Sequence, residues 1–250
     1  MTYKLEICAN SVQSCVEAQK GGAYRVELCA GIPEGGTTPS YGDIAMAREL
    51  MKETKLNVII RPRGGDFLYT ELEHKTMLKD IEICRKLRVD GVVIGCLTAE
   101  GDIDMPRCKE LVEAAGEMNV TFHRAFDMCR DPFESLEKIV SLGCEIILTS
   151  GQQPKAEQGI SLIKKLVEQA AGRIVIMPGS GVNAGNIAKI AKETGAVQFH
   201  LSARKSYESN MKYRNPDLKM GGTNVVINEY GQDITCSETV KETIKQLYKV

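Results

Sequence analysis

Apolar and polar positions along the chain follow two alternating patterns. Short runs rich in branched and aromatic residues are typical of β-strands, and they lie at Lys4–Cys8, Arg25–Leu28, Val58–Arg61, Val92–Gly95, Val120–His123, Ile146–Thr149, Ile174–Met177 and Val197–Leu201. Between them, apolar residues recur at helical spacing near residues 12–20, 41–53, 71–88, 106–118, 133–142, 157–170, 184–193 and 238–248. The chain therefore alternates strand and helix throughout.

Such an alternation favours a parallel sheet, either closed into a barrel or open and doubly wound. Eight units in 250 residues, with no sign of a second domain, match the usual size of a (β/α)8 barrel. The sequence predicts a single-domain TIM barrel over residues 1–250. A long irregular loop is expected at about 205–235, after the last strand, where it would act as a surface loop, a lid or an oligomer arm.

Composition narrows the choice of partners and location. With 32 basic and 33 acidic residues the net charge is −1, which argues against nucleic acid and membrane surfaces as partners. The first strand begins almost at Met1 and leaves no room for a signal peptide, and no apolar run approaches the roughly 20 residues of a membrane span. Nine cysteines without a CxxC pair indicate reduced thiols. We expect a cytoplasmic protein.

Alternate residues of a barrel strand face the helices and the interior. Apolar residues of one parity mark the helix-facing set, which comprises Leu5, Ile7, Val26, Leu28, Val58, Ile60, Val120, Phe122, Ile146, Leu148, Val197, Phe199 and Leu201. The opposite parity gives an inward set that is unusually polar: Glu6, Cys8, Glu27, Cys29, Arg61, Arg63, His123, Thr149, His200 and Ser202. Buried charges must pair or bind something, so this set indicates either a functional site or structural ion pairs.

Several of these residues suit the binding of an anion. Arg61 and Arg63 could hold a carboxylate or phosphate by bidentate hydrogen bonds, or form salt bridges with Glu27 or Glu6. The loop Gly179, Ser180 and Gly181 precedes a predicted helix, where backbone amides can approach an anion, although a tight turn explains the same glycines. Ser202 and Arg204 would complete such a site after the last strand.

Other residues suit proton transfer. The candidates for acid and base roles lie at the carboxyl ends of strands, and they are Glu27, His123, Asp127 and His200. His74 lies in a predicted helix instead, and we expect it on the surface.

Glu6-Ile7-Cys8-Ala9 and Glu27-Leu28-Cys29-Ala30 repeat the same pattern on successive strands. Neighbouring strands lie about 4.8 Å apart, so the two thiols could share a soft metal, or the two acids could raise each other's pKa. Coincidence between two similar strands accounts for so short a repeat equally well.

Longer motifs resemble those of the CutC copper homeostasis family. They are Ile59-Ile60-Arg61-Pro62-Arg63-Gly64-Gly65-Asp66-Phe67, Thr121-Phe122-His123-Arg124-Ala125-Phe126-Asp127 and Ile147-Leu148-Thr149-Ser150-Gly151-Gln152, and the similarity covers most of residues 4–205. The resemblance implies a cytoplasmic, homo-oligomeric TIM barrel that binds Cu(I) through Cys29, with Cys8 as a second ligand. The chain departs from the family at Ser180, where a third glycine is usual, and this restricts the backbone there.

Two functions follow from these observations. The first is a CutC-like copper homeostasis protein whose partner is the copper ion. The alternative is a TIM-barrel enzyme that acts on a small phosphorylated or carboxylated metabolite by acid/base chemistry. Arginines, acids and histidines that converge from several strands favour the second, and the family resemblance favours the first.

Overall fold

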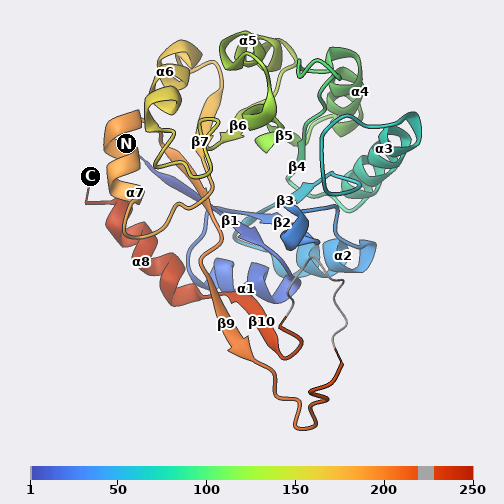
Figure 1. Cartoon of the computed structure of the whole chain (residues 1–250), viewed down its shortest axis with the longest axis vertical. Helices are drawn as coiled ribbons and strands as arrows, with labels where there is room; N and C mark the ends of the chain where they lie inside the picture. Colours follow the sequence, from blue (N-terminus) through green and yellow to red (C-terminus); the bar gives the residue numbers. More distant parts are fainter. Residues whose placement is uncertain (1, 219–227, 250) are drawn as a thin grey trace.

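The computed structural model describes residues 2–218 and 228–249 and shows a parallel barrel (Figure 1). The sheet has eight strands in the order β7-β6-β5-β4-β3-β2-β1-β8, and its edge strands β7 and β8 lie against each other. The strands are β1 (Lys4–Ala9), β2 (Arg25–Leu28), β3 (Lys55–Ile59), β4 (Gly91–Ile94), β5 (Asn119–Phe122), β6 (Ile146–Thr149), β7 (Val175–Pro178) and β8 (Gln198–Leu201). The predicted single-domain (β/α)8 fold is confirmed.

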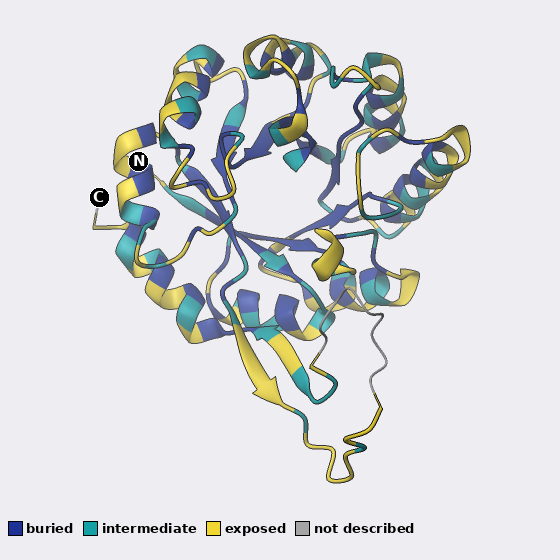
Figure 2. Cartoon of the chain, in the orientation of Figure 1, coloured by how far each residue is buried: buried dark blue, intermediate teal, exposed yellow. Residues whose placement is uncertain are grey.

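Helices form a ring outside the sheet, with their inner faces buried and their outer faces exposed (Figure 2). They are α1 (Val12–Lys20), α2 (Tyr41–Leu50), α3 (Glu71–Lys86), α4 (Met105–Ala115), α5 (Pro132–Ser141), α6 (Ile160–Ala170), α7 (Ile187–Thr194) and α8 (Ser237–Leu247). Ser11, Ser40, Thr70, Asp104 and Asp131 begin five of them, and each side chain accepts a hydrogen bond from a first-turn amide. None of the helices in the described residues is both long and apolar enough to cross a membrane.

The packing of the strands follows the predicted parity, with one exception. Leu5, Ile7, Val26 and Phe199 belong to the main core between sheet and helices. On β6 the prediction is wrong: Ile147 joins that core, whereas Ile146 and Leu148 form a separate cluster with Met177. Three consecutive apolar residues give β6 no polar alternation, so the sequence did not reveal which face is which.

His74 is buried, contrary to the expected surface position. It is 3% exposed, and its Nε2 atom lies 2.8 Å from Glu110 Oε2 on α4. His74, Met77, Ile81 and Cys84 are all buried on α3 at spacings of three and four residues, so His74 belongs to the helix face that packs against the barrel.

The segment expected to be an irregular loop at about 205–235 contains two strands, and its residues 219–227 lie outside the described part of the chain. β9 (Arg204–Glu208) and β10 (Gly231–Thr235) pair antiparallel and extend away from the barrel beside α1 (Figure 1). The base of this ribbon is tied to α1, because the Thr235 amide donates to Ser14 Oγ at 3.0 Å. Its first residue is Arg204, only three positions after β8 ends, so the ribbon carries this arginine directly to the carboxyl ends of the strands.

Candidate functional site

A cavity of about 390 Å³ opens at the carboxyl ends of the strands. It collects most of the residues that the sequence predicts for the site: Cys8, Glu27, Cys29, Arg61, His123, Ser180, Gly181, His200, Ser202 and Arg204. Its apolar walls were not predicted, and they come from Ile32, Ile59, Phe67, Leu148 and Val182. The inward parity of the strands identified part of the polar lining, while the apolar lining comes from β3 and β6, through Ile59 and Leu148, and from loops, through Ile32, Phe67 and Val182.

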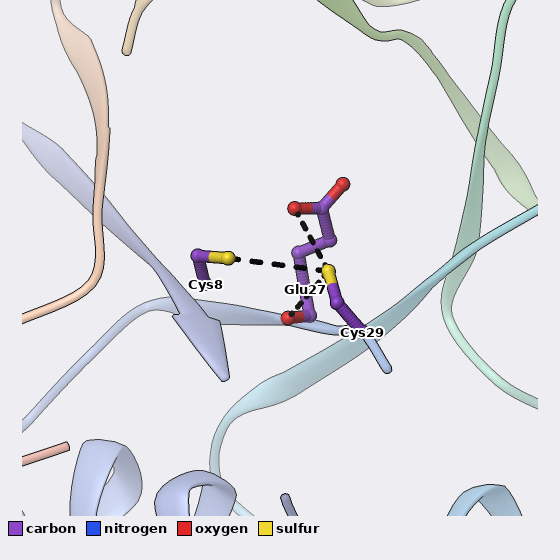
Figure 3. A group of neighbouring side chains, drawn as sticks. All are labelled: Cys8, Glu27 and Cys29. Atoms are coloured by element: carbon purple, nitrogen blue, oxygen red, sulfur yellow. Dashed lines mark hydrogen bonds between the residues drawn. The ribbon is translucent and has the colours of Figure 1, made fainter. Parts of the chain in front are cut away.

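Cys8, Glu27 and Cys29 form a tight group in this cavity (Figure 3). Cys8 is paired with Glu27 across β1 and β2, and Cys29 follows Glu27 by two residues, so all three side chains lie on the inner face. The Sγ atoms of Cys8 and Cys29 are 3.9 Å apart, and Cys29 Sγ lies 3.4 Å from Glu27 Oε2. The repeated pattern in the sequence thus corresponds to a real cluster.

A chain of charged groups lies beside the thiols. The Arg25 guanidinium pairs with Glu6, which is 1% exposed, and Glu6 Oε1 lies 2.7 Å from His200 Nδ1. His200 Nε2 is 3.7 Å from Glu27 Oε2. Burial opposes the ionised form of Glu6, but Arg25 and His200 outweigh it and lower its pKa to about 2. Burial also opposes charge on His200, yet its contacts with Cys8, Glu6 and Glu27 raise its pKa well above 6.5, which favours the protonated ring.

The two thiols of the cluster differ in protonation. The hydrogen bond from Cys29, together with His200 and Arg204, lowers the pKa of Cys8 well below its usual value, although burial opposes this. Arg204 Nη2 lies 3.3 Å from Cys8 Sγ. The hydrogen bond to Cys8 and burial raise the pKa of Cys29 well above 9.0. Burial raises the pKa of Glu27 to about 8. Cys8 is therefore the more acidic of the two thiols, and a pKa of about 8 favours the protonated form of Glu27 at neutral pH.

Arg61 does not present the free guanidinium fork expected from the sequence. Its Nη1 donates to the backbone carbonyls of Glu34 and Gly36 at 2.8 and 2.9 Å, and its Nη2 donates to that of Gly65 at 2.8 Å. The guanidinium also stacks on Phe67, 4.9 Å from the ring centre. Arg61 therefore joins the loops after β2 and β3.

The predicted salt bridges of Arg61 and Arg63 with the inward acids are not seen, because Arg25 takes that role for Glu6. Arg25 was not among the predicted site residues, although the strand pattern indicates it: Arg25 precedes Glu27 by two residues on β2 and so faces the same side. Arg63 lies outside the cavity lining, where it pairs with Glu73 at 2.5 Å and Asp66 at 2.9 Å.

Asp127 and Gly179 do not line the cavity either. The Asp127 carboxylate accepts hydrogen bonds from Arg124 Nε at 2.7 Å, from Thr149 Oγ1 at 2.5 Å and from the Ser150 amide at 3.0 Å. Its oxygens are thus occupied in joining the loops after β5 and β6. Gly179 is needed for close packing, since a Cβ atom there would lie 2.5 Å from Leu148 Cδ1.

His123 is 4% exposed and is neutral near pH 7. Burial and the nearby Arg61 charge lower its pKa to about 3. Its Nδ1 accepts a hydrogen bond from the Ala125 amide at 3.2 Å, so the ring proton is on Nε2. Within the described residues Nε2 has no hydrogen-bond partner. His123 therefore offers the cavity a hydrogen-bond donor.

The loop after β7 has an unusual backbone. Ser180 and Gly181 have φ angles of 75° and 71°, so Ser180 adopts the left-handed conformation that favours glycine. Its hydroxyl donates to the Pro154 carbonyl at 2.8 Å, and its own carbonyl accepts from the Ala156 amide at 2.9 Å. Two hydrogen bonds to the loop after β6 thus stabilise Ser180 in a backbone conformation that residues other than glycine rarely adopt.

Comparisons with known proteins agree on one family. The model of the CutC family matches residues 3–205. A Bacteroides fragilis protein named family protein CutC is 61% identical over 98% of this chain and 97% of its own length. The human copper homeostasis protein cutC homolog is 45% identical over 93% of this chain and 85% of its own length.

The solved structure of a putative copper homeostasis protein CutC from Streptococcus agalactiae superposes with a TM-score of 0.78 and is 38% identical, covering 80% of this chain and 99% of that one. The family model spans all eight barrel strands and every predicted residue of the cavity. This chain belongs to the CutC family.

Proposed function

We propose that this protein binds Cu(I) in the cytoplasm through Cys8 and Cys29, as part of copper homeostasis. One observation carries the proposal: the two sulfur atoms lie 3.9 Å apart in the wall of an open cavity, with Glu27 in the same cluster. Cu(I) prefers soft thiolate ligands. Two metal–sulfur bonds of about 2.3 Å, as in zinc thiolates, can span sulfurs up to about 4.6 Å apart, so this pair needs little movement to share an ion.

The surroundings of the pair also favour a metal thiolate. Cys8 is already the more acidic thiol, and Arg204 and His200 supply positive charge beside it. Cu(I) with two thiolates carries one negative charge, which these cations balance. Glu27 Oε2 and His200 Nε2 stand next to the sulfurs as candidate third ligands, each after losing its proton.

The proposed cytoplasmic location is consistent with the same chemistry. All nine cysteines are free thiols, and the reducing cytoplasm keeps thiols in that state. A homo-oligomer remains part of the proposal, and the β9–β10 ribbon is the projecting element that it would use.

Competition with a chromophoric Cu(I) chelator, under anaerobic reducing conditions, tests the proposal. Cys8→Ser and Cys29→Ser should each weaken Cu(I) binding by at least about tenfold, because each removes one of two soft ligands. Cys84→Ser is the matched control, since Cys84 is fully buried on α3 away from the cavity. Equal affinity in wild type and both cluster variants would contradict the proposal.

A second function is favoured by a different observation. The cavity of about 390 Å³ lies within the roughly 300–1,000 Å³ of small-molecule sites and is far larger than one ion. Glu27, with a pKa raised to about 8, suits general acid/base catalysis near neutral pH. We therefore propose, as the alternative, an enzyme acting on a small phosphorylated or carboxylated metabolite. Conversion of such a metabolite by wild type but not by Glu27→Gln would support it.

A further inference from the structure

The loop after β7 lines the cavity with Ser180, Gly181 and Val182. Among the described residues, no acceptor is found for the amides of Ser180, Gly181 and Val182. The flanking amides are both satisfied: Gly179 donates to the Thr149 carbonyl at 2.9 Å, and Asn183 donates to Asn186 Oδ1 at 2.8 Å. Consecutive free amides at a turn make a concave site for an anion.

Arg204 lies at the same side of the barrel, where β8 leads into β9. Its Nη2 contacts the carbonyl and Sγ of Cys8, both at 3.3 Å, while its Nε is buried and has no partner among the described residues. The guanidinium therefore retains a free donor. Of the described residues that line the cavity, three are arginines, namely Arg61, Arg124 and Arg204, and Glu27 is the one acidic residue.

His123 supplies an independent observation that points to a ligand. It directly follows β5, which lies across the barrel from β1, and it lines the same cavity. Its Nε2 hydrogen is a buried donor for which no described residue provides an acceptor. Buried donors are nearly always paired in native proteins, so an oxygen from a molecule in the cavity is the expected partner.

We propose that the cavity binds a small organic oxyanion, whose phosphate or carboxylate group lies on the amides of Ser180–Val182 and on Arg204, and whose second oxygen accepts from His123. Leu148, Ile59 and Phe67 line the cavity and would cover its carbon atoms. This inference rests on the second proposed function, because it defines the substrate class of that enzyme, and it is independent of copper.

Titration calorimetry on the metal-free full-length protein tests the subsite with three probes: inorganic phosphate, malonate and glycerol 3-phosphate. Arg204→Met should weaken the binding of every probe at least about tenfold, because it removes a charge-assisted contact. Arg63→Met is the matched control and should bind as wild type does, since Arg63 lies outside the cavity. Arg204→Lys, which keeps the charge beside Cys8, serves if the Met variant does not fold, and it should lose several-fold in affinity.

His123→Asn tests the two-point contact. Asn Oδ1 can replace Nδ1 as the acceptor for the Ala125 amide, while the Nε2 donor is lost. The variant should weaken glycerol 3-phosphate several-fold and leave inorganic phosphate unchanged, because only the larger probe reaches His123. Preference for phosphate or for malonate identifies which oxyanion the subsite takes.

Two results would overturn the subsite: no binding of any probe to the wild type, or an equal loss in Arg63→Met and Arg204→Met. Different results would contradict the copper function and the catalytic function. Cys29→Ser should lose Cu(I) and keep its affinity for phosphate, and a protein that binds phosphate without converting any metabolite would retain the subsite while contradicting the catalytic function.

Discussion

Arg25 and Glu6 form a buried ion pair inside the barrel, with side-chain exposures of 7% and 1%. Through the second oxygen of Glu6 this pair orients His200, which in turn lies beside the Cys8–Glu27–Cys29 cluster. The electrostatics of the candidate site therefore depend on two residues, on β1 and β2, that do not line the cavity.

Arg25→Met should destabilise the protein by about 3–5 kcal/mol, because it leaves the Glu6 carboxylate buried with only His200 as a partner. Urea unfolding measures this free energy. The double variant Arg25→Met/Glu6→Gln removes both charges and should recover part of the loss. A loss below about 1 kcal/mol in the single variant would show that the pair is not needed.

His123 should make the protein sensitive to mild acid. The fold lowers its pKa from 6.5 to about 3, so its contribution is fully present above pH 6.5 and is lost as the pH falls toward 3. Each pH unit in this window removes about 1.4 kcal/mol, or roughly 2–3 kcal/mol between pH 6.5 and 4.5. His123→Asn lacks this titration, and its unfolding free energy should fall less steeply over the same range. Parallel slopes for the two proteins would contradict a neutral, buried ring.

Arg61→Met should destabilise the protein by about 2–4 kcal/mol, because three backbone carbonyls lose a charged donor. Limited proteolysis should then cleave the loops after β2 and β3 faster. Arg63→Met removes contacts of a side chain that is 37% exposed, and we expect a loss of less than about 1 kcal/mol. The opposite order would mean that Arg61 is a ligand-binding residue rather than a loop contact.

Gly179→Ala should destabilise the protein by about 1–3 kcal/mol, because the new Cβ atom would lie 2.5 Å from Leu148 Cδ1 and 3.3 Å from His200 Cβ. It should also weaken phosphate binding, since the amides of the next three residues would move. Gly42→Ala is the control: Gly42 is exposed on α2, and a Cβ atom there would only make an ordinary contact with Ser40 Oγ at 3.8 Å, so the substitution should stabilise the helix by up to about 1 kcal/mol. Thermal unfolding of both variants gives the comparison.

The sequence by itself determined the barrel and much of its interior. Eight alternating units dictate a parallel sheet, and the period of two along each strand assigns Glu6, Cys8, Glu27 and His200 to the inside, because side chains on a strand point alternately to its two faces. The same rule failed on β6, because Ile146, Ile147 and Leu148 are all apolar and no alternation of polar and apolar residues distinguishes the two faces of that strand.

Only the tertiary structure decided what each inward group contacts. Arg25 rather than Arg61 neutralises Glu6, Arg61 holds three loop carbonyls, and Asp127 is occupied by neighbouring loops, because partners are chosen by distances between segments far apart in sequence. The protonation states of the inward acids could not be predicted from the sequence either. Glu6 and Glu27 occupy the same place in a repeated motif, yet one has a pKa of about 2 and the other of about 8, since only Glu6 has an arginine and a histidine bonded to it.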